Sequence, residues 1–227
     1  MQWDNFVRAW NDARIGDFFL NTLIVVIPAL ILTLIISAMA AYVLARFEFV
    51  GNRFLFYLFL MGMLFPIFLA LVPLFSLVNN LGLLNTYFGL ILVYIAYSLP
   101  FTIFFLIGFF KTLPSELPEA AIIDGANQYQ VFFLVMLPLA APGLLSMAIF
   151  NFLGMWNQYV LPLVLVSDEN KYVLSQGLAF MLFQQFYQND WSALFAAVTL
   201  IMIPTLVLYI IFQGQIQRGM TSGALKG

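Results

Sequence analysis

The 227-residue sequence contains no cysteine and no histidine. Without cysteine the chain can form no disulfide, iron–sulfur cluster or thiolate site, and without histidine it lacks the commonest metal ligand and general base. It also lacks the glycine-rich Walker pattern that cradles nucleotide phosphates. We therefore expect this chain to bind no metal or cofactor and to have no enzymatic activity of its own.

Charged side chains are scarce: 8% of the residues are Asp, Glu, Lys or Arg, and the net charge is −2. A soluble domain is about 25% charged and about 45–50% apolar, whereas this chain is 64% hydrophobic with a mean hydropathy of +1.02. The composition predicts a polytopic membrane protein that does not bind nucleic acid. The first residues lack the basic and apolar regions of a signal peptide, so we expect none.

Long apolar runs fill most of the sequence. A helix needs about 20 apolar residues to cross the hydrocarbon core of a membrane. Five stretches qualify, and none of them contains Asp, Glu, Lys or Arg: 18–45, 54–78, 87–110, 132–166 and 193–212. We predict an all-α, polytopic transmembrane helical bundle with five spans, organised as a single domain over residues 1–227.

Prolines interrupt several of these stretches. A proline inside a helix removes a hydrogen bond and bends the axis, so Pro66 and Pro100 predict bends in the second and third spans. The fourth stretch is too long for one straight helix and carries Pro138 and Pro142 near its start. We expect the membrane-crossing part of this stretch to begin near Gly143.

The segment at residues 111–131 is short, charged and divided by a glycine. Ser115 predicts the start of a helix, and Gly125 predicts its end, because glycine suits the left-handed position that follows a helix. Asn127 and Gln130 have the spacing of a capping box for a second helix. We expect two short helices that meet at an angle around Gly125.

This loop offers a surface for a protein partner. The side chains of Ala120 and Ala121 are small enough to let a partner backbone approach, and Glu119 offers a charge to a basic or N–H-rich pocket. The alternative interpretation is an ordinary interfacial loop with solvated acids.

The spacing of residues in and after the loop is specific. The pattern is Glu119-Ala120-Ala121, three residues, Gly125, nine residues, Val135, one residue and Leu137-Pro138. It resembles the loop shared by the permease subunits of ATP-binding-cassette (ABC) importers, where isoleucine is usual in place of valine. The resemblance implies docking on a separate ATPase subunit by Glu119, Ala120, Ala121, Asp124, Gly125, Leu137 and Pro138.

The resemblance extends along the chain. Residues 83–86, 123–126, 156–159 and 218–227 are similar to those of carbohydrate-type permeases of the maltose-transporter MalG class. This similarity implies that the glycine-rich tail also contacts the ATPase subunits, through Gly223, Lys226 and Gly227. A frayed end is the alternative interpretation of the tail.

The same resemblance predicts the partners and the topology. We expect a homologous second permease subunit, two ATPase subunits that bind ATP and Mg, and an extracytoplasmic solute-binding protein that docks at residues 167–191. Permeases of this class usually have six spans, whereas this sequence has five and begins in the segment expected between the first two. We therefore expect an extracytoplasmic N-terminus and a cytoplasmic C-terminus in the inner membrane.

The distribution of basic residues agrees with this orientation. With residues 111–131 in the cytoplasm, the basic residues divide into five inside (46, 53, 111, 218 and 226) and three outside (8, 14 and 171). An excess of Lys and Arg on the cytoplasmic side is typical of membrane proteins.

Polar and aromatic residues of the fourth stretch are candidates for a substrate path. Asn151 and Asn157 offer amides for sugar hydroxyls, and Trp156 and Tyr159 offer aromatic faces. The alternatives are hydrogen bonds between helices for the asparagines and an interfacial aromatic belt for the aromatics.

The spans contain no ionisable group of the kind that ion-coupled carriers place in the membrane, which favours a neutral substrate moved by an external motor. We predict a permease subunit of an ATP-driven importer that translocates a mono- or oligosaccharide. The alternatives are a permease of this class for a polyol or glycerol phosphodiester and, less favoured, a secondary carrier or channel.

Overall fold

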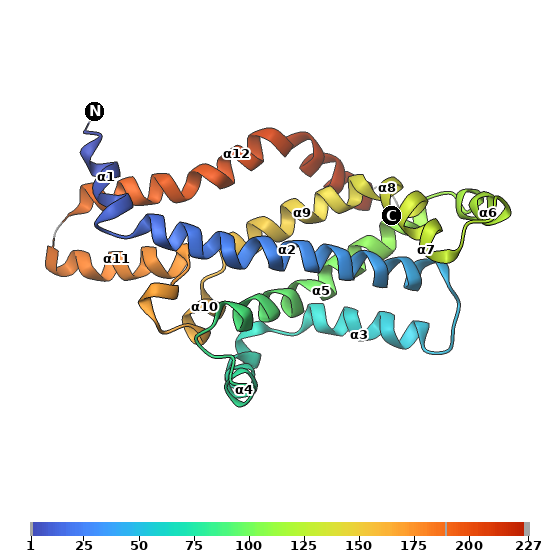
Figure 1. The fold of residues 1–227 in the computed structure, drawn as a ribbon, viewed down its shortest axis with the longest axis horizontal. Helices are drawn as coiled ribbons and strands as arrows, with labels where there is room; N and C mark the ends of the chain where they lie inside the picture. Colours follow the sequence, from blue (N-terminus) through green and yellow to red (C-terminus); the bar gives the residue numbers. More distant parts are fainter. Residues whose placement is uncertain (1, 189, 225–227) are drawn as a thin grey trace. The chain divides into compact units, whose positions relative to one another are not determined.

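The computed structural model of the chain describes residues 2–188 and 190–224, and every regular element in this part is helical (Figure 1). The prediction of an all-α fold is therefore confirmed. In chain order the elements are α1 (Asp4–Asn11), α2 (Ile15–Arg46), α3 (Asn52–Leu64), α4 (Ile67–Asn80), α5 (Tyr87–Thr112), α6 (Glu116–Ile123), α7 (Gln128–Gln130), the π-helix η1 (Val131–Met136), α8 (Leu137–Leu139), α9 (Ala141–Trp156), α10 (Val160–Leu165), the 3₁₀-helix η2 (Glu169–Lys171), α11 (Leu174–Gln188) and α12 (Trp191–Ala224).

The membrane-crossing helices agree with the predicted stretches. Helices α2, α5 and the part of α12 from Trp191 to Gly214 are each long and apolar enough to cross a membrane. Two pairs of helices separated by a sharp break, α3 with α4 and α7–α8 with α9, bring the number of spans to five if each pair is one span. On that count, two of the five predicted spans are broken helices.

Two of the prolines act differently from each other. Phe65, which precedes Pro66, has an extended backbone with ψ of 123°, and α3 ends at Leu64. A residue before proline is disfavoured in the helical region, so Pro66 separates two helices where the sequence predicted only a bend. Pro100 lies inside α5, which continues to Thr112.

The fourth apolar stretch changes direction before it crosses the membrane. The helical axis turns by 70° between Gln128–Leu139 and Ala141–Trp156. Helix α9 therefore begins at Ala141, two residues earlier than the predicted start near Gly143. Pro142 lies in the first turn of α9, where its missing N–H removes no helical hydrogen bond.

The chain forms two compact units, and each is assembled from segments far apart in the sequence. The first unit contains Met1–Ala29, Pro66–Tyr94 and Phe152–Gln213; the second contains Leu30–Phe65, Ile95–Asn151 and Gly214–Gly227. Because these segments alternate along the chain, neither unit is a consecutive domain. The single-domain organisation of residues 1–227 stays a prediction.

The core of the first unit joins α1 and the start of α2 to α9, α11 and α12. Its buried residues are Ala9, Ile15, Phe18, Trp156, Leu174, Met181, Ala193, Leu194, Ala196 and Ala197. The closest approach is that of Gly177 on α11 to Phe18 on α2. A Cβ atom at Gly177 would lie 2.0 Å from Cδ2 of the phenyl ring, so the absence of a side chain permits this contact.

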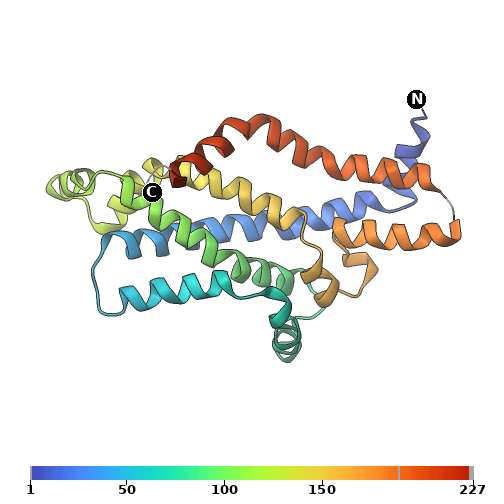
Figure 2. The same cartoon turned by 180° about the vertical axis from the view of Figure 1, so that it is seen from behind.

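The core of the second unit positions the loop between α5 and α9. The ring of Tyr42 on α2 packs against Phe110 on α5 and Phe132 on η1, at centroid distances of 5.7 and 5.2 Å. At the end of α2, Nη2 of Arg46 donates to the carbonyl oxygen of Phe110 at 2.8 Å. A cation is favourable at the carbonyl end of a helix. Figures 1 and 2 show α6 and α7 beyond this end of α5.

Candidate functional site

Helix α6 begins where the sequence predicts, but Ser115 does not cap it with its side chain. Ser115 occupies the N-cap position with a helical backbone, φ −76° and ψ −21°, and its hydroxyl makes no capping hydrogen bond. Side-chain capping requires a backbone in the β region. Glu116 and Glu119 lie in the first turn, where carboxylates interact favourably with the helix dipole.

Gly125 ends α6 in the predicted left-handed conformation, with φ of +89°. The N–H of Gly125 donates to the carbonyl of Ile122 at 3.0 Å, and the N–H of Ala126 donates to that of Ala121 at 2.9 Å. These two hydrogen bonds form a Schellman motif. The direction of the chain after α6 is therefore set by local hydrogen bonds and by the glycine.

The predicted capping box is also confirmed. The side-chain oxygen of Asn127 accepts from the N–H of Gln130 at 3.0 Å, and the side-chain oxygen of Gln130 accepts from the N–H of Asn127 at 2.9 Å. Two reciprocal bonds satisfy backbone donors that the start of a helix leaves free. Helices α6 and α7 thus meet around Gly125. The Schellman motif ends α6, and the capping box starts α7.

The structure separates the predicted docking residues into two groups. Glu119, Ala120, Asp124, Gly125 and Pro138 are exposed, whereas Ala121 and Leu137 pack against the core of the second unit. Ala121 is partly buried against this core while Ala120 is exposed, and docking of an ATPase subunit on either alanine stays a prediction. Successive helical residues point about 100° apart, so a neighbouring pair on a short helix cannot share one face.

Three apolar residues beside these side chains were not predicted as part of the site. Ile122, Ile123 and Tyr129 are exposed by 47%, 85% and 77%. Large apolar side chains exposed beside charged ones are typical of a protein–protein contact. The sequence could have indicated this exposed apolar surface. A helix of only eight residues that carries apolar side chains on more than one face cannot bury all of them.

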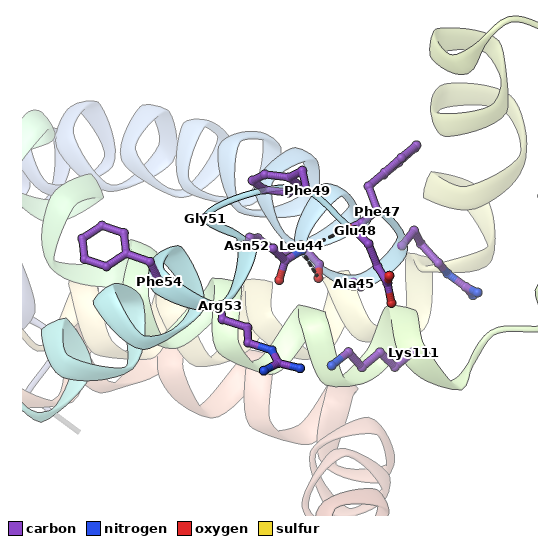
Figure 3. Close-up of a pocket in the computed structure, with 11 residues that line it drawn as sticks. Leu44, Ala45, Phe47, Glu48, Phe49, Gly51, Asn52, Arg53, Phe54 and Lys111 are labelled. Carbon is purple, nitrogen blue, oxygen red and sulfur yellow. Dashed lines mark hydrogen bonds between the residues drawn. The ribbon is translucent and has the colours of Figure 1, made fainter.

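A basic hollow lies in the same unit, between the end of α2, the start of α3 and Lys111 of α5 (Figure 3). Its volume is about 700 Å³, and its charged lining residues are Arg46, Glu48, Arg53 and Lys111. Figure 3 shows the side chains of Arg53 and Lys111 extending toward the same opening. Three cations to one carboxylate make the lining of the hollow positive.

Asn151, the first substrate-path candidate, bonds to a neighbouring helix. Its side chain is buried, and Nδ2 donates to the hydroxyl oxygen of Thr102 on α5 at 2.9 Å. The hydroxyl of Thr102 in turn donates to the carbonyl of Ser98 at 2.7 Å. Asn151 therefore forms the hydrogen bond between helices that was the alternative to a contact with substrate. Its role in the substrate path stays a prediction.

Trp156 is buried in the core of the first unit, with 2% of its surface exposed. Its ring stacks on Phe152 at 5.3 Å and meets Phe19 edge-on, and Nε1 donates to the carbonyl of Ile201 at 3.3 Å. The indole therefore has neither an open face nor a free N–H for a sugar. The interpretation of Trp156 as part of an interfacial belt is wrong, because the ring is enclosed by protein.

Asn157 and Tyr159 lie in the break between α9 and α10. Asn157 is exposed, and its Nδ2 donates to the carbonyl of Leu153 at 2.8 Å. Tyr159 is half-buried at the N-cap position of α10. Of the four substrate-path candidates, Asn157 is the exposed one, and its amide oxygen has no hydrogen-bond partner in the described part of the chain.

The segment predicted to meet a binding protein, residues 167–191, is largely helical, with α11 at its centre. Its start is held by Asn85, which has φ of +58°. The side-chain oxygen of Asn85 accepts from the N–H of Asp168 at 2.9 Å, and its carbonyl accepts from Nζ of Lys171 at 3.0 Å. The N–H of Asn170 donates to the Asp168 carboxylate, and this bond lowers the pKa of Asp168.

The tail is only partly described. Gly223 lies within α12, which extends well past the predicted span to Ala224. Lys226 and Gly227 lie outside the described residues. Contact of all three with ATPase subunits stays a prediction.

The model of one protein family, described as "Binding-protein-dependent transport system inner membrane component", matches residues 33–222. The chain belongs to this family. It is a permease component of an ABC importer and a multi-pass protein of the inner membrane. The predicted resemblance to the importer permeases is thus confirmed, while the identity of the partner subunits stays a prediction.

Individual relatives agree with this assignment. The chain is 52% identical to the diacetylchitobiose uptake system permease protein NgcG of Streptomyces coelicolor, over 99% of this chain and 74% of the relative. It is 36% identical to the arabinooligosaccharides transport system permease protein AraQ of Halalkalibacterium halodurans, over 99% of this chain and 79% of the relative.

A solved structure shares the fold. It is that of a bacterial ABC transporter involved in the import of the acidic polysaccharide alginate, with a TM-score of 0.84 and 23% sequence identity. The match covers 94% of this chain and 79% of the other.

Proposed function

We propose that this permease translocates a sugar, either a mono- or an oligosaccharide, that an extracytoplasmic binding protein delivers. The observation that carries the proposal is the 52% identity, over 99% of the chain, to a permease named for diacetylchitobiose uptake. The second relative is named for arabinooligosaccharides. The uncharged membrane stretches agree with a neutral substrate, because carriers coupled to ions place ionisable groups in the membrane.

The energy for transport comes from ATP and Mg bound on separate ATPase subunits, which dock on α6 and α7. The exposed Glu119, Ala120 and Asp124 support this role, together with the apolar surface of Ile123 and Tyr129. The Schellman motif and the capping box set the shape of the loop before a partner binds. A preformed surface loses less conformational entropy on docking.

We assign the loop and the C-terminus to the cytoplasm, and the N-terminus and residues 167–191 to the opposite side. The basic hollow supports this orientation, because Arg53 and Lys111 belong to the same unit as α6. Lys and Arg accumulate on the cytoplasmic side of membrane proteins.

The substrate is tested by uptake into proteoliposomes that contain the permease with its sibling permease, ATPase subunits and binding protein. Labelled diacetylchitobiose, an arabino-oligosaccharide, a polyol and a glycerol phosphodiester are compared, with and without ATP. We expect saturable, ATP-dependent accumulation of a sugar. Accumulation of only the polyol or the phosphodiester would overturn the sugar assignment, and ATP-independent uptake would indicate a secondary carrier.

The docking surface is tested by a matched pair of charge reversals. Glu116 and Glu119 are both exposed and both lie in the first turn of α6, so Glu116→Lys and Glu119→Lys disturb the helix dipole to a similar extent. We expect Glu119→Lys to lose ATPase-subunit retention and uptake, and Glu116→Lys to keep both. Equal effects of the two variants would mean that the loop contact does not depend on Glu119.

A further inference from the structure

Helix α1 runs across the direction of α2 in both views of the chain (Figures 1 and 2). Its eight residues extend only about 12 Å, too short to cross a membrane. Arg14, with φ of +58°, turns the chain between the two helices. Because spanning helices tilt by only about 20° from the membrane normal on average, a helix transverse to α2 lies close to the membrane plane.

One face of α1 is apolar and exposed. Trp3, Val7 and Trp10 are exposed by 67%, 56% and 41%. Their spacing, i, i+4 and i+7, places them on one side of a helix. Phe6 and Ala9 point elsewhere and pack in the core of the first unit. Trp3 and Val7 are therefore not needed to hold α1 to α2, whereas Trp10 also packs against α2.

The remaining surface of α1 is polar and fixes its position. Asp4 and Asn11 are exposed, and Nη1 of Arg8 contacts the carboxylate of Asp190 at 2.6 Å. Asp190 precedes α12 and accepts a hydrogen bond from the N–H of Ala193 at 3.2 Å. The ion pair thus connects α1 directly to the start of a spanning helix.

The apolar face continues onto α2. The indole of Trp10 packs against Gly16, where a Cβ atom would lie 2.8 Å from the ring. Leu20 and Ile24 follow Gly16 at four-residue intervals, so all three share a side of α2. Leu20 and Ile24 are exposed by 57% and 50% within a helix that crosses the membrane. Such side chains contact lipid or another chain of the complex.

Exposed tryptophan is concentrated on α1 and at the start of α12. Of the four tryptophans in the chain, Trp156 is enclosed in the core, and the other three are exposed: Trp3, Trp10 and Trp191 at the start of α12. Tryptophan is enriched where a membrane meets water, because its ring is apolar and its N–H is polar.

We propose that α1 is an interfacial anchor that lies in the headgroup region of the bilayer. Trp3, Val7 and Trp10 insert toward the acyl chains, and the polar side chains of Asp4, Arg8 and Asp12 remain in water. The partner is the phospholipid surface itself. Because the only basic residue of α1, Arg8, is paired with a carboxylate, the anchor depends on apolar burial and not on anionic lipids. The anchored α1 holds the starts of α2 and α12 at the same depth in the membrane.

The absence of cysteine allows a direct test on the complete transporter complex in nanodiscs. Val7→Cys and Asp12→Cys each receive a spin label; both positions are exposed, and Asp12, which ends α1 with a helical backbone, lies about 140° around the helix axis from Val7. Collision rates are measured with oxygen, which concentrates in lipid, and with a water-soluble nickel chelate. ATP-driven uptake by the unlabelled variants verifies that both complexes fold.

We expect the label at position 7 to favour oxygen several-fold more than the label at position 12, in phosphatidylcholine with or without phosphatidylglycerol. Equal preference for the nickel chelate at both positions would place α1 in water and overturn the proposal. Shielding of position 7 from both reagents would mean that a protein chain covers α1. A preference for oxygen that requires phosphatidylglycerol would contradict anchoring by apolar burial.

Discussion

The side-chain amide of Asn151 lies 2.9 Å from the hydroxyl oxygen of Thr102 and joins α9 to α5 inside the second unit. A buried amide without this partner would carry an unsatisfied donor, which costs more than the bond itself contributes. The pair therefore gives Asn151 a structural role that needs no substrate, whereas Asn157 is exposed and its amide oxygen accepts no hydrogen bond from the residues that the structure describes.

We expect Asn151→Ala to lower stability and leave sugar recognition intact. A hydrogen bond between helices in a membrane contributes about 0.6 kcal/mol on average, so the complex should still assemble. Combined with Thr102→Val, the loss should be less than additive, because both changes remove the same bond. Thermal unfolding of the purified complex measures this effect.

Asn157→Ala should instead change sugar uptake while the amount of assembled complex stays normal. The measurement is uptake over a range of sugar concentrations, normalised to complex. If Asn151→Ala raises the half-saturation concentration and Thr102→Val does not, Asn151 contacts the sugar. Unchanged half-saturation and maximal rate in both asparagine variants would remove these side chains from the substrate path.

Gly125→Ala should weaken retention of the ATPase subunits more than Gly108→Ala. Apart from the adjoining backbone, no atom of the described residues lies within 4 Å of a Cβ atom built at either glycine, so both have space for the methyl group. Only Gly125 has a positive φ, +89°, and an L-residue there costs on the order of 1–2 kcal/mol. Co-purification of the ATPase measures retention, and equal retention in both variants would refute a need for the left-handed turn.

Gln128→Cys and Glu169→Cys should react with an impermeant maleimide from opposite sides of the membrane. Both side chains are exposed and make no hydrogen bond in the described part of the chain. Position 128 belongs to α7 and should label from the cytoplasmic side, and position 169 from the other. Labelling of both from one side would show that the proposed orientation is wrong.

Gly177→Ala should destabilise the first unit by about 1–3 kcal/mol, the usual cost of overpacking a core. The new methyl group would meet the ring of Phe18 at 2.0 Å. Phe18→Leu in the same chain should recover part of the loss, since it removes the ring that clashes. Gly154→Ala is the control, because that site is open; the melting temperature of the complex is the measurement.

Asp168 should contribute stability that is lost in acid. Its pKa is held below the ordinary value of 3.8, chiefly by the hydrogen bond from the Asn170 N–H. The carboxylate of Asp168 is therefore protonated at a higher pH in the unfolded chain than in the folded chain. Its contribution to the free energy of unfolding is present above pH 3.8 and disappears as the pH falls through the pKa of the folded state. Asp168→Asn removes this titration.

The melting temperatures of the wild-type and Asp168→Asn complexes should consequently converge as the pH is lowered from about 6 to about 3. A difference between them that stays constant over this range would mean that the charge of Asp168 contributes nothing to the folded state.

Features that depend on neighbouring residues could be predicted from the sequence. The capping box of Asn127 and Gln130 and the left-handed Gly125 each require only a few consecutive residues. The apolar stretches are likewise local, because the length needed to cross a membrane is a property of one segment. The spacing from Glu119 to Pro138 was sufficient to indicate the family that the comparisons confirm.

Features that depend on distant segments required the tertiary structure. Trp156 and Asn151 are five residues apart in one helix, yet one is enclosed by Phe19 and Phe152 and the other bonds to Thr102. Nothing in the spacing along the helix names these partners. Hydrogen bonding and burial of a side chain are decided by whichever segments pack beside it, and this packing follows from the whole chain.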